Sequence, residues 1–242
     1  METRPPILEV RRLAKAFGGL KVTHDVSFAV RKGELSAIIG PNGAGKTTLF
    51  NLITGKLVPD AGEVLYKGER IDGLHPADIA RRGIGRAFQI TSIFKERTAL
   101  ENVLVAVLAR EGRTTRLMRR ALSHIGEVRE SMELLSMVDL ADRADTRAGS
   151  LPHGDQKRLD IAVALALNPE LVLLDEPMAG MSPEERSVTV DLIRKIWKEK
   201  ALTLLFIERV LNQGVLLAEG TPAEISRNRE VITAYLGEEI VE

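Results

Sequence analysis

A glycine-rich loop between an apolar strand and a helix constrains the fold of this chain more than any other feature. The segment Gly-Pro-Asn-Gly-Ala-Gly-Lys-Thr occupies residues 40–47, after the apolar run Leu35–Ile39 and at the start of the helical pattern Lys46–Thr54. This order fits the phosphate-binding loop, in which glycines turn backbone N–H groups toward a phosphate and the helix N-terminus adds a favourable dipole. The sequence therefore predicts an α/β fold that binds a phosphate-bearing ligand.

The residue types of the loop assign roles within this site. The Lys46 ammonium is expected to reach the β- and γ-phosphates, and the Thr47 hydroxyl to bind Mg²⁺. Nucleotide contacts are expected from Gly40, Pro41, Asn42, Gly43, Ala44, Gly45, Lys46, Thr47 and Thr48.

Two carboxylates follow a second apolar strand. Residues 171–177 read Leu-Val-Leu-Leu-Asp-Glu-Pro, so Asp175 stands at the carboxyl end of a buried strand, where ligands bind in open α/β sheets. Asp175 is suited to hold Mg²⁺ directly or through water. Glu176, one residue on, is suited to orient or deprotonate the attacking water. The phosphate loop and this acidic pair predict one Mg-nucleotide site.

Short apolar runs with helical patterns between them predict a largely parallel sheet covered on both faces. Strand signals nearly vanish from Thr98 to Ala166, which indicates an inserted helical subdomain. We expect a single domain with an ATP-binding core over 1–88 and 170–242 and a helical subdomain over 89–169. In addition to strand Leu35–Ile39 and helix Lys46–Thr54, the expected elements are strands Ile7–Val10, Val26–Val30, Glu63–Tyr66, Leu171–Leu174 and Leu202–Ile207 and helix Pro183–Lys198.

Composition narrows the class of protein. Lys+Arg and Asp+Glu are both 34, a balance that argues against binding to nucleic acid. The chain has no cysteine, which excludes disulfides and thiol chemistry. The N-terminus does not predict a signal peptide, and no apolar run approaches the roughly 18 residues of a membrane span. We expect a soluble protein.

With these motifs in order, the chain resembles the ATPase subunits of ABC transporters. The resemblance implies that Phe17 stacks on adenine and that Gln89, in Gly85-Arg-Ala-Phe-Gln, is the glutamine that senses Mg²⁺ and the attacking water. It also implies a P-loop (RecA-like) core with an antiparallel β subdomain. Residues 151–158, Leu-Pro-His-Gly-Asp-Gln-Lys-Arg, match the signature motif of the helical subdomain.

The signature motif departs from the usual pattern. Pro152 replaces a serine and His153 replaces the first glycine, while Gly154 is retained. In the family this motif closes over the ATP held by the phosphate loop of another subunit. Gly154 and Asp155 are therefore expected to contact nucleotide in a pair of ATPase subunits, identical or different.

The departures resemble the LivG-like subgroup that serves branched-chain amino acid importers. That subgroup implies an ATPase at the cytoplasmic face of the inner membrane, with transmembrane permease subunits as partners and a solute-binding protein as an indirect one. Importers of urea or short amides use similar cassettes and stay an alternative. Soluble translation or repair factors of the family usually carry two cassettes or long coiled coils, and one phosphate loop argues against them.

One family element is missing after the strand Leu202–Ile207. The family has a switch histidine, a helix and a further strand there, whereas Glu208 is followed directly by Arg209-Val-Leu-Asn-Gln-Gly. Either the natural protein has lost this segment or the sequence lacks residues that the natural protein has. The resemblance therefore leaves a second reading open, an ATP-binding cassette that hydrolyses ATP slowly.

Overall fold

The structure is a computed structural model that describes residues 5–39, 43–87, 93–112, 125–177 and 182–208. Their contacts define two units, the first comprising the described residues up to Ile79 together with 205–208, and the second those from Ala80 to Leu204. The boundary falls inside helix α2 (Pro76–Arg81) and strand β8 (Thr203–Glu208). The expected division into 1–88 with 170–242 and 89–169 stays a prediction.

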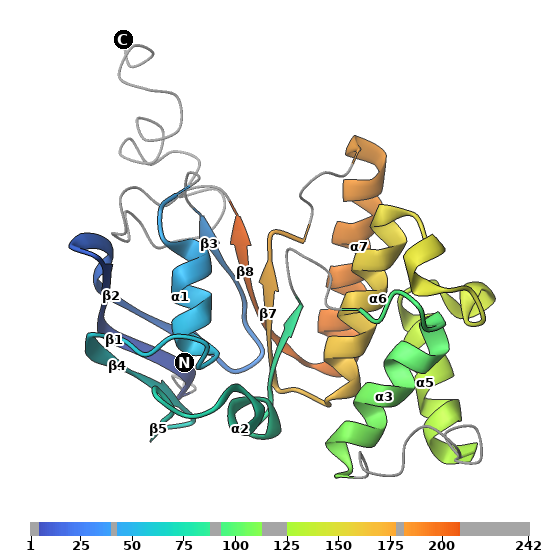
Figure 1. Cartoon of the computed structure of the whole chain (residues 1–242), viewed down its shortest axis with the longest axis horizontal. Helices are drawn as coiled ribbons and strands as arrows, with labels where there is room; N and C mark the ends of the chain where they lie inside the picture. Colours follow the sequence, from blue (N-terminus) through green and yellow to red (C-terminus); the bar gives the residue numbers. More distant parts are fainter. Residues whose placement is uncertain (1–4, 40–42, 88–92, 113–124, 178–181, 209–242) are drawn as a thin grey trace. The chain divides into compact units, whose positions relative to one another are not determined.

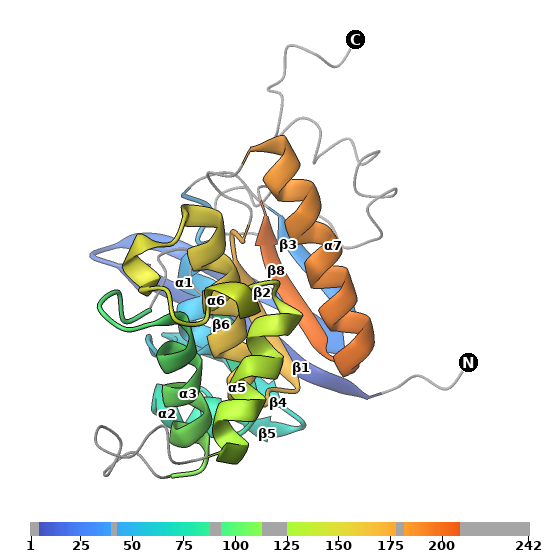
Figure 2. The same cartoon turned by 90° about the vertical axis from the view of Figure 1, so that its right-hand side faces the viewer.

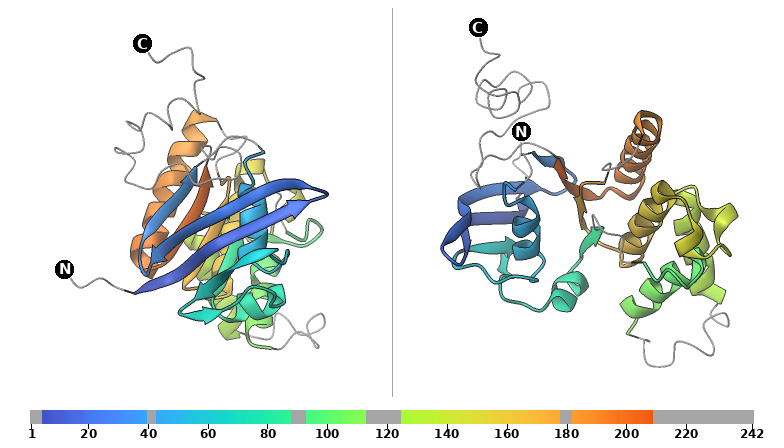
Figure 3. Two further views of the ribbon diagram at one scale, coloured as in Figure 1. Left: turned by 90° about the vertical axis from the view of Figure 1, so that its left-hand side faces the viewer. Right: turned by 45° about the horizontal axis from the view of Figure 1, so that its top comes forward.

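The first unit contains an antiparallel sheet with the strand order β2-β1-β4-β5. Strands β1 and β2 are joined at Gly18 and Gly19, whose φ angles of 53° and 87° lie in the left-handed region that glycine adopts without strain. Figure 3 shows the resulting long hairpin in blue. The strands are β1 (Pro6–Phe17), β2 (Leu20–Arg31), β4 (Ala61–Tyr66) and β5 (Glu69–Arg70).

Side chains alternate between the two faces of this sheet. Leu8 and Val10 of β1 are buried and stand opposite Tyr66 and Val64 of β4, which are also buried. Arg11, the next residue along β1, points outward and forms a 3.1 Å ion pair with Glu63. This pattern is typical of an antiparallel sheet with one face in the core, and it confirms the expected antiparallel part of the fold.

The first unit also holds strand β3 (Leu35–Ile39) and helix α1 (Lys46–Ile53), which flank the phosphate loop. Helix α1 lies close to β2 in Figure 1 and buries Leu49, Phe50, Leu52 and Ile53. In this unit β3 has β8 as its sheet neighbour.

In the second unit, strands β6 (Ile84–Ala87) and β7 (Leu171–Asp175) pair in parallel, from Ile84 opposite Leu171 to Ala87 opposite Leu174. Strand β8 follows on the other side of β7. All five residues of β7 are buried, as its four leading apolar residues predict, and the fifth is Asp175.

Among the described residues of the second unit, four α-helices accompany these strands: α3 (Ala99–Arg110), α5 (Ile125–Met137), α6 (His153–Ala166) and α7 (Pro183–Lys200). Figure 2 shows α3, α5 and α6 side by side. Arg110 on α3 joins Glu130 on α5 through two hydrogen bonds of 2.6 and 2.8 Å. The described residues between Thr98 and Ala166 are mainly helical, so the expected helical segment is confirmed. No helix in the described ranges is long and apolar enough to cross a membrane.

The expected elements are present, with shifted ends. The run Leu35–Ile39 coincides with β3, whereas Ile7–Val10 and Val26–Val30 lie inside the longer β1 and β2. Both strands continue past the apolar residues because backbone hydrogen bonds, which need no apolar side chains, hold the hairpin arm together. The sequence analysis missed α2, β5 and β6, which have two to six residues each.

The close approach of β1 and β4 at Gly62 leads to a stability prediction. A Cβ on Gly62 (φ 84°) would lie 2.4 Å from the Arg12 carbonyl oxygen, whereas a Cβ on Gly68 (φ 80°) would meet nothing within 4 Å. Gly68→Ala should cost about 1 kcal/mol for the left-handed backbone alone. Gly62→Ala should lower the melting temperature by clearly more, because β1 must also move. Equal losses measured by calorimetry would contradict this packing.

Candidate functional site

The described part of the phosphate loop ends at Gly45, where the backbone conformation and the close packing leave no space for a side chain. Gly45 caps the N-terminus of α1 with φ at 84°, and its carbonyl oxygen accepts a 2.8 Å hydrogen bond from the Leu49 N–H. A Cβ at this position would stand 2.4 Å from the Val22 carbonyl oxygen of β2. The end of the loop is therefore pressed against the sheet of the first unit. Residues 40–42 lie outside the described residues.

Helix α1 begins with a positive site. Lys46 is its first residue and is only 5% exposed, and no acidic residue stands in the first turn. The unpaired N–H groups of a helix start and its dipole favour an anion. Thr47 is exposed and Thr48 half-buried at the same helix end. The geometry suits a phosphate group, as expected from the sequence.

Phe17 ends β1 with 45% of its surface exposed. The Lys15 ammonium lies 5.7 Å from its ring centroid and forms a 2.6 Å ion pair with Asp60. Hydrogen bonds from Lys15 and then from the Ala16 N–H lower the pKa of the Asp60 carboxyl. An aromatic ring exposed in this way is available to stack on a flat base, and its role with adenine stays a prediction.

The second unit places Asp175 at the buried end of β7. One carboxylate oxygen, Oδ2, accepts a 2.7 Å hydrogen bond from the Arg86 guanidinium on β6, and the two side chains are 2% and 7% exposed. Burial lowers the pKa of Arg86, and the hydrogen bond to Asp175 opposes that shift. The other oxygen, Oδ1, is buried and has no hydrogen-bond partner within the described residues. A buried carboxylate oxygen with an open acceptor position fits a Mg²⁺ ligand or a hydrogen bond from a metal-bound water.

Glu176 follows Asp175 with a left-handed backbone. Its φ is 48°, which is uncommon for a residue other than glycine and costs of order 1 kcal/mol. The Lys157 ammonium on α6 donates long hydrogen bonds to the carbonyl oxygens of Glu176, at 3.5 Å, and Pro177, at 3.4 Å. Such strained residues cluster at functional sites, so this backbone agrees with the role expected for Glu176.

Within the second unit, the structure thus brings together Asp175, Glu176, Arg86 and Lys157. The sequence analysis missed the last two, although both lie inside motifs that it identified. The signal that could have identified Arg86 is the presence of a charged residue within the short segment that precedes the loop expected at Gln89. For Lys157 no signal distinguished it from an exposed lysine.

The signature segment starts α6 and turns its charged side chains inward. Asp155 is 4% exposed, and its carboxylate oxygens accept hydrogen bonds from Arg143 and Arg158. Pro152 and His153 are exposed, and a Cβ on Gly154 would lie 3.2 Å from Glu185 Oε1. The Asp155 carboxylate thus holds two arginines, and the start of α6 also presents backbone N–H groups, which favour an anion. The nucleotide roles of Gly154 and Asp155 stay predictions.

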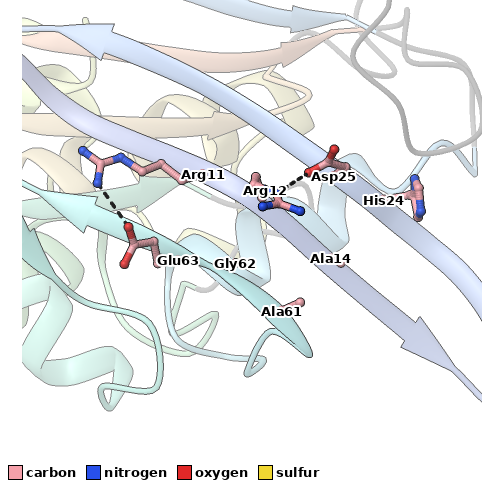
Figure 4. A pocket seen from close by; sticks show the side chains of 8 residues that line it. All are labelled: Arg11, Arg12, Ala14, His24, Asp25, Ala61, Gly62 and Glu63. Atoms are coloured by element: carbon pink, nitrogen blue, oxygen red, sulfur yellow. Dashed lines mark hydrogen bonds and ion pairs between the residues drawn. The ribbon is translucent and has the colours of Figure 1, made fainter.

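Gln89, Arg209 and the expected switch position lie outside the described residues. Figure 4 shows a shallow hollow over β1, β2 and β4, where Arg12 and Asp25 are 3.4 Å apart. The residues that line the hollow include none of the predicted site residues.

Comparisons with known proteins agree with these motifs. Residues 23–179 match the family described as ABC transporter, and residues 215–241 match the one described as branched-chain amino acid ATP-binding cassette transporter. The chain is 41% identical to BraF of Pseudomonas aeruginosa, a high-affinity branched-chain amino acid transport ATP-binding protein, over 96% of this chain and 98% of BraF. It is 38% identical to LivG of Escherichia coli K12, which has the same description, with the same coverage.

The alignment with BraF is longer than this chain. It spans 258 positions, whereas the chain has 242 residues, so BraF contains residues that have no counterpart here.

A solved structure matches the fold. The crystal structure of the ADP conformation of MJ1267, an ATP-binding cassette of an ABC transporter, superimposes with a TM-score of 0.82 at 31% identity, over 97% of this chain and all of that chain. This likeness confirms the expected P-loop core with its antiparallel and helical parts. On the family match, the two relatives and this structure together, the chain belongs to the ABC transporter family as one of its ATP-binding cassette ATPases.

Proposed function

We propose that this chain is the ATP-hydrolysing subunit of an importer for branched-chain amino acids. The observation that carries the ATP part is the start of α1, where a buried Lys46 and a glycine packed against β2 stand at a helix N-terminus, which favours an anion. The amino-acid part is supported by the likeness to BraF and LivG and by the match at residues 215–241.

In this proposal each site residue has one task. The loop N–H groups and Lys46 bind the β- and γ-phosphates, and Phe17 stacks on adenine. Thr47, Asp175 and Gln89 would hold Mg²⁺, which would neutralise charge on the phosphates when bound with ATP. Glu176 accepts a proton from the attacking water or orients this water. The left-handed backbone of Glu176 sets the direction in which its side chain leaves the main chain.

The proposal includes partners and a location. A helix start with exposed Pro152 and His153 is suited to meet the γ-phosphate held by another cassette, so two ATPase subunits act together. Transmembrane permease subunits bind the pair at the cytoplasmic face of the inner membrane, and a solute-binding protein acts through them. The balance of charges gives no reason to expect nucleic acid as a partner.

A second candidate function is an ATP-binding cassette that hydrolyses ATP slowly. It is favoured by the alignment with BraF, which contains residues that this chain lacks. If these include the switch histidine, a positioned donor at the γ-phosphate is absent, and the loss of one such donor typically costs about 10²–10³ in rate.

Replacement of Lys46 tests the anion site. Lys46→Ala removes a charge-assisted contact and should weaken MgATP binding about tenfold to a hundredfold in a calorimetric titration. Lys21→Ala is the matched control, since it removes the same charge from an exposed position on β2 of the same unit. If both variants bind MgATP like the wild type, Lys46 is not a phosphate ligand.

Replacement of Glu176 tests the hydrolytic role and separates the two candidates. Glu176→Gln should bind MgATP normally, reduce the hydrolysis rate about 10²–10⁴-fold and retain an ATP-bound dimer on gel filtration. Glu133→Gln, an exposed change on α5, should leave the rate as it is. A wild-type rate no faster than that of Glu176→Gln would favour the slowly hydrolysing cassette.

Reconstitution tests the transported solute. The chain, assembled with its permease subunits in vesicles, should hydrolyse ATP faster when a solute-binding protein loaded with leucine is added. Stimulation by urea or a short amide in place of leucine would assign the transporter to the alternative importers. Lack of assembly with any permease would contradict a transport role.

A further inference from the structure

Arg86 and Asp175 form a buried ion pair at the ends of two parallel strands. Arg86 lies on β6 opposite Leu173 of β7, and its guanidinium reaches along the sheet to Asp175 Oδ2 at 2.7 Å. The exposed fractions of the side chains, 7% and 2%, leave little room for water to screen the pair.

A buried ion pair of this kind needs a reason other than stability. The attraction between the charges is largely offset by the loss of their hydration, so apolar residues of similar size often serve a fold equally well. Strand β7 is otherwise wholly apolar, and the pair interrupts its buried sequence only at the last residue.

The carboxylate of Asp175 is only half satisfied. Oδ1 is buried without a hydrogen-bond partner in the part of the chain that the structure describes. Two other carboxylates of the same unit differ: Asp155 uses one oxygen for Arg143 and the other for Arg158, and Glu130 uses both for Arg110. Those two pairs are complete in themselves, whereas the pair of Arg86 and Asp175 leaves one acceptor oxygen for something else.

We propose that Arg86 is a positioning residue that holds the Asp175 carboxylate in one orientation, with Oδ2 fixed and Oδ1 presented to Mg²⁺ or to one of its water ligands. The inference rests on the proposed role of Asp175 at a Mg-nucleotide site. A guanidinium suits this task because it is planar and keeps its proton when buried, so it donates in a fixed direction. A lysine ammonium would supply the same charge without that direction.

The inference predicts a specific loss in Arg86→Lys. The readout is the Mg²⁺ increment, defined as the ATP affinity measured calorimetrically with Mg²⁺ divided by the affinity measured with a chelator. Residues that orient metal ligands typically contribute about 10–100-fold to metal affinity, so the increment should fall about tenfold or more. ATP affinity without Mg²⁺ should stay within about twofold of the wild type, because Lys46 and the loop are unchanged.

Arg110→Lys is the matched control. It makes the same substitution at another arginine of the second unit, one that binds Glu130 by a two-bond pair. It should lower the melting temperature and leave the Mg²⁺ increment unchanged. If Arg86→Lys behaves in the same way, Arg86 is a structural residue and the inference is wrong.

A double-mutant cycle and a second variant complete the test. Asp175→Asn should itself reduce the increment, and adding Arg86→Lys to it should cause no further loss, since Arg86 acts through Asp175. Arg86→Gln, which keeps a planar N–H donor without the charge, replaces Arg86→Lys if the latter does not fold. Failure of both variants to fold would assign the pair to folding and overturn the inference. A wild-type chain without any Mg²⁺ increment would instead refute the proposed nucleotide site.

Discussion

Strand β7 places the carboxylate of Asp175 in a buried position, and the arrangement of the second unit's site depends on the group that pairs with this carboxylate. A buried carboxylate is costly unless a cation or hydrogen-bond donors lie close to it. Parallel pairing with β6 supplies the cation, because the register of the two strands brings Arg86 within 2.7 Å of Asp175 Oδ2. The strand register therefore supplies the partner that the buried carboxylate needs.

The next residue shows how the same strand end serves chemistry. Glu176 leaves β7 with a left-handed backbone, and Lys157 of α6 binds the carbonyl oxygens of Glu176 and Pro177. A buried ammonium on the signature helix thus stabilises a strained turn at the expected catalytic carboxylate. Hydrogen bonds from the Lys157 side chain therefore link the first turns of α6 to the backbone at the end of β7.

In the first unit, the structure depends on a close approach of the main chain that only a glycine, Gly45, permits. The phosphate loop must end close to β2, and Gly45 allows this because it has no side chain to meet the Val22 carbonyl oxygen. The same residue caps the N-terminus of α1, and a helix N-terminus favours an anion. The signature motif shows a division between exposed and buried residues. The changed residues Pro152 and His153 are exposed, while Asp155 and Lys157 face inward and anchor the helix.

The sequence by itself determined those features that depend on neighbouring residues. The phosphate loop with its strand and helix, the acidic pair at the end of an apolar strand and the helical middle segment could all be predicted, because local periodicity and glycine spacing encode them. Short elements such as β6 could not, since four residues that include a glycine and an arginine have no strand pattern of their own.

Only the tertiary structure decided which distant side chains meet. Arg86 and Asp175 are 89 positions apart in the chain, and Lys157 and Glu176 are 19 apart. Strand register and helix packing select these partners, and neither can be read from the residues next to them. The open oxygen of Asp175 was likewise invisible in the sequence, because an unmet acceptor exists only once burial has removed water from it.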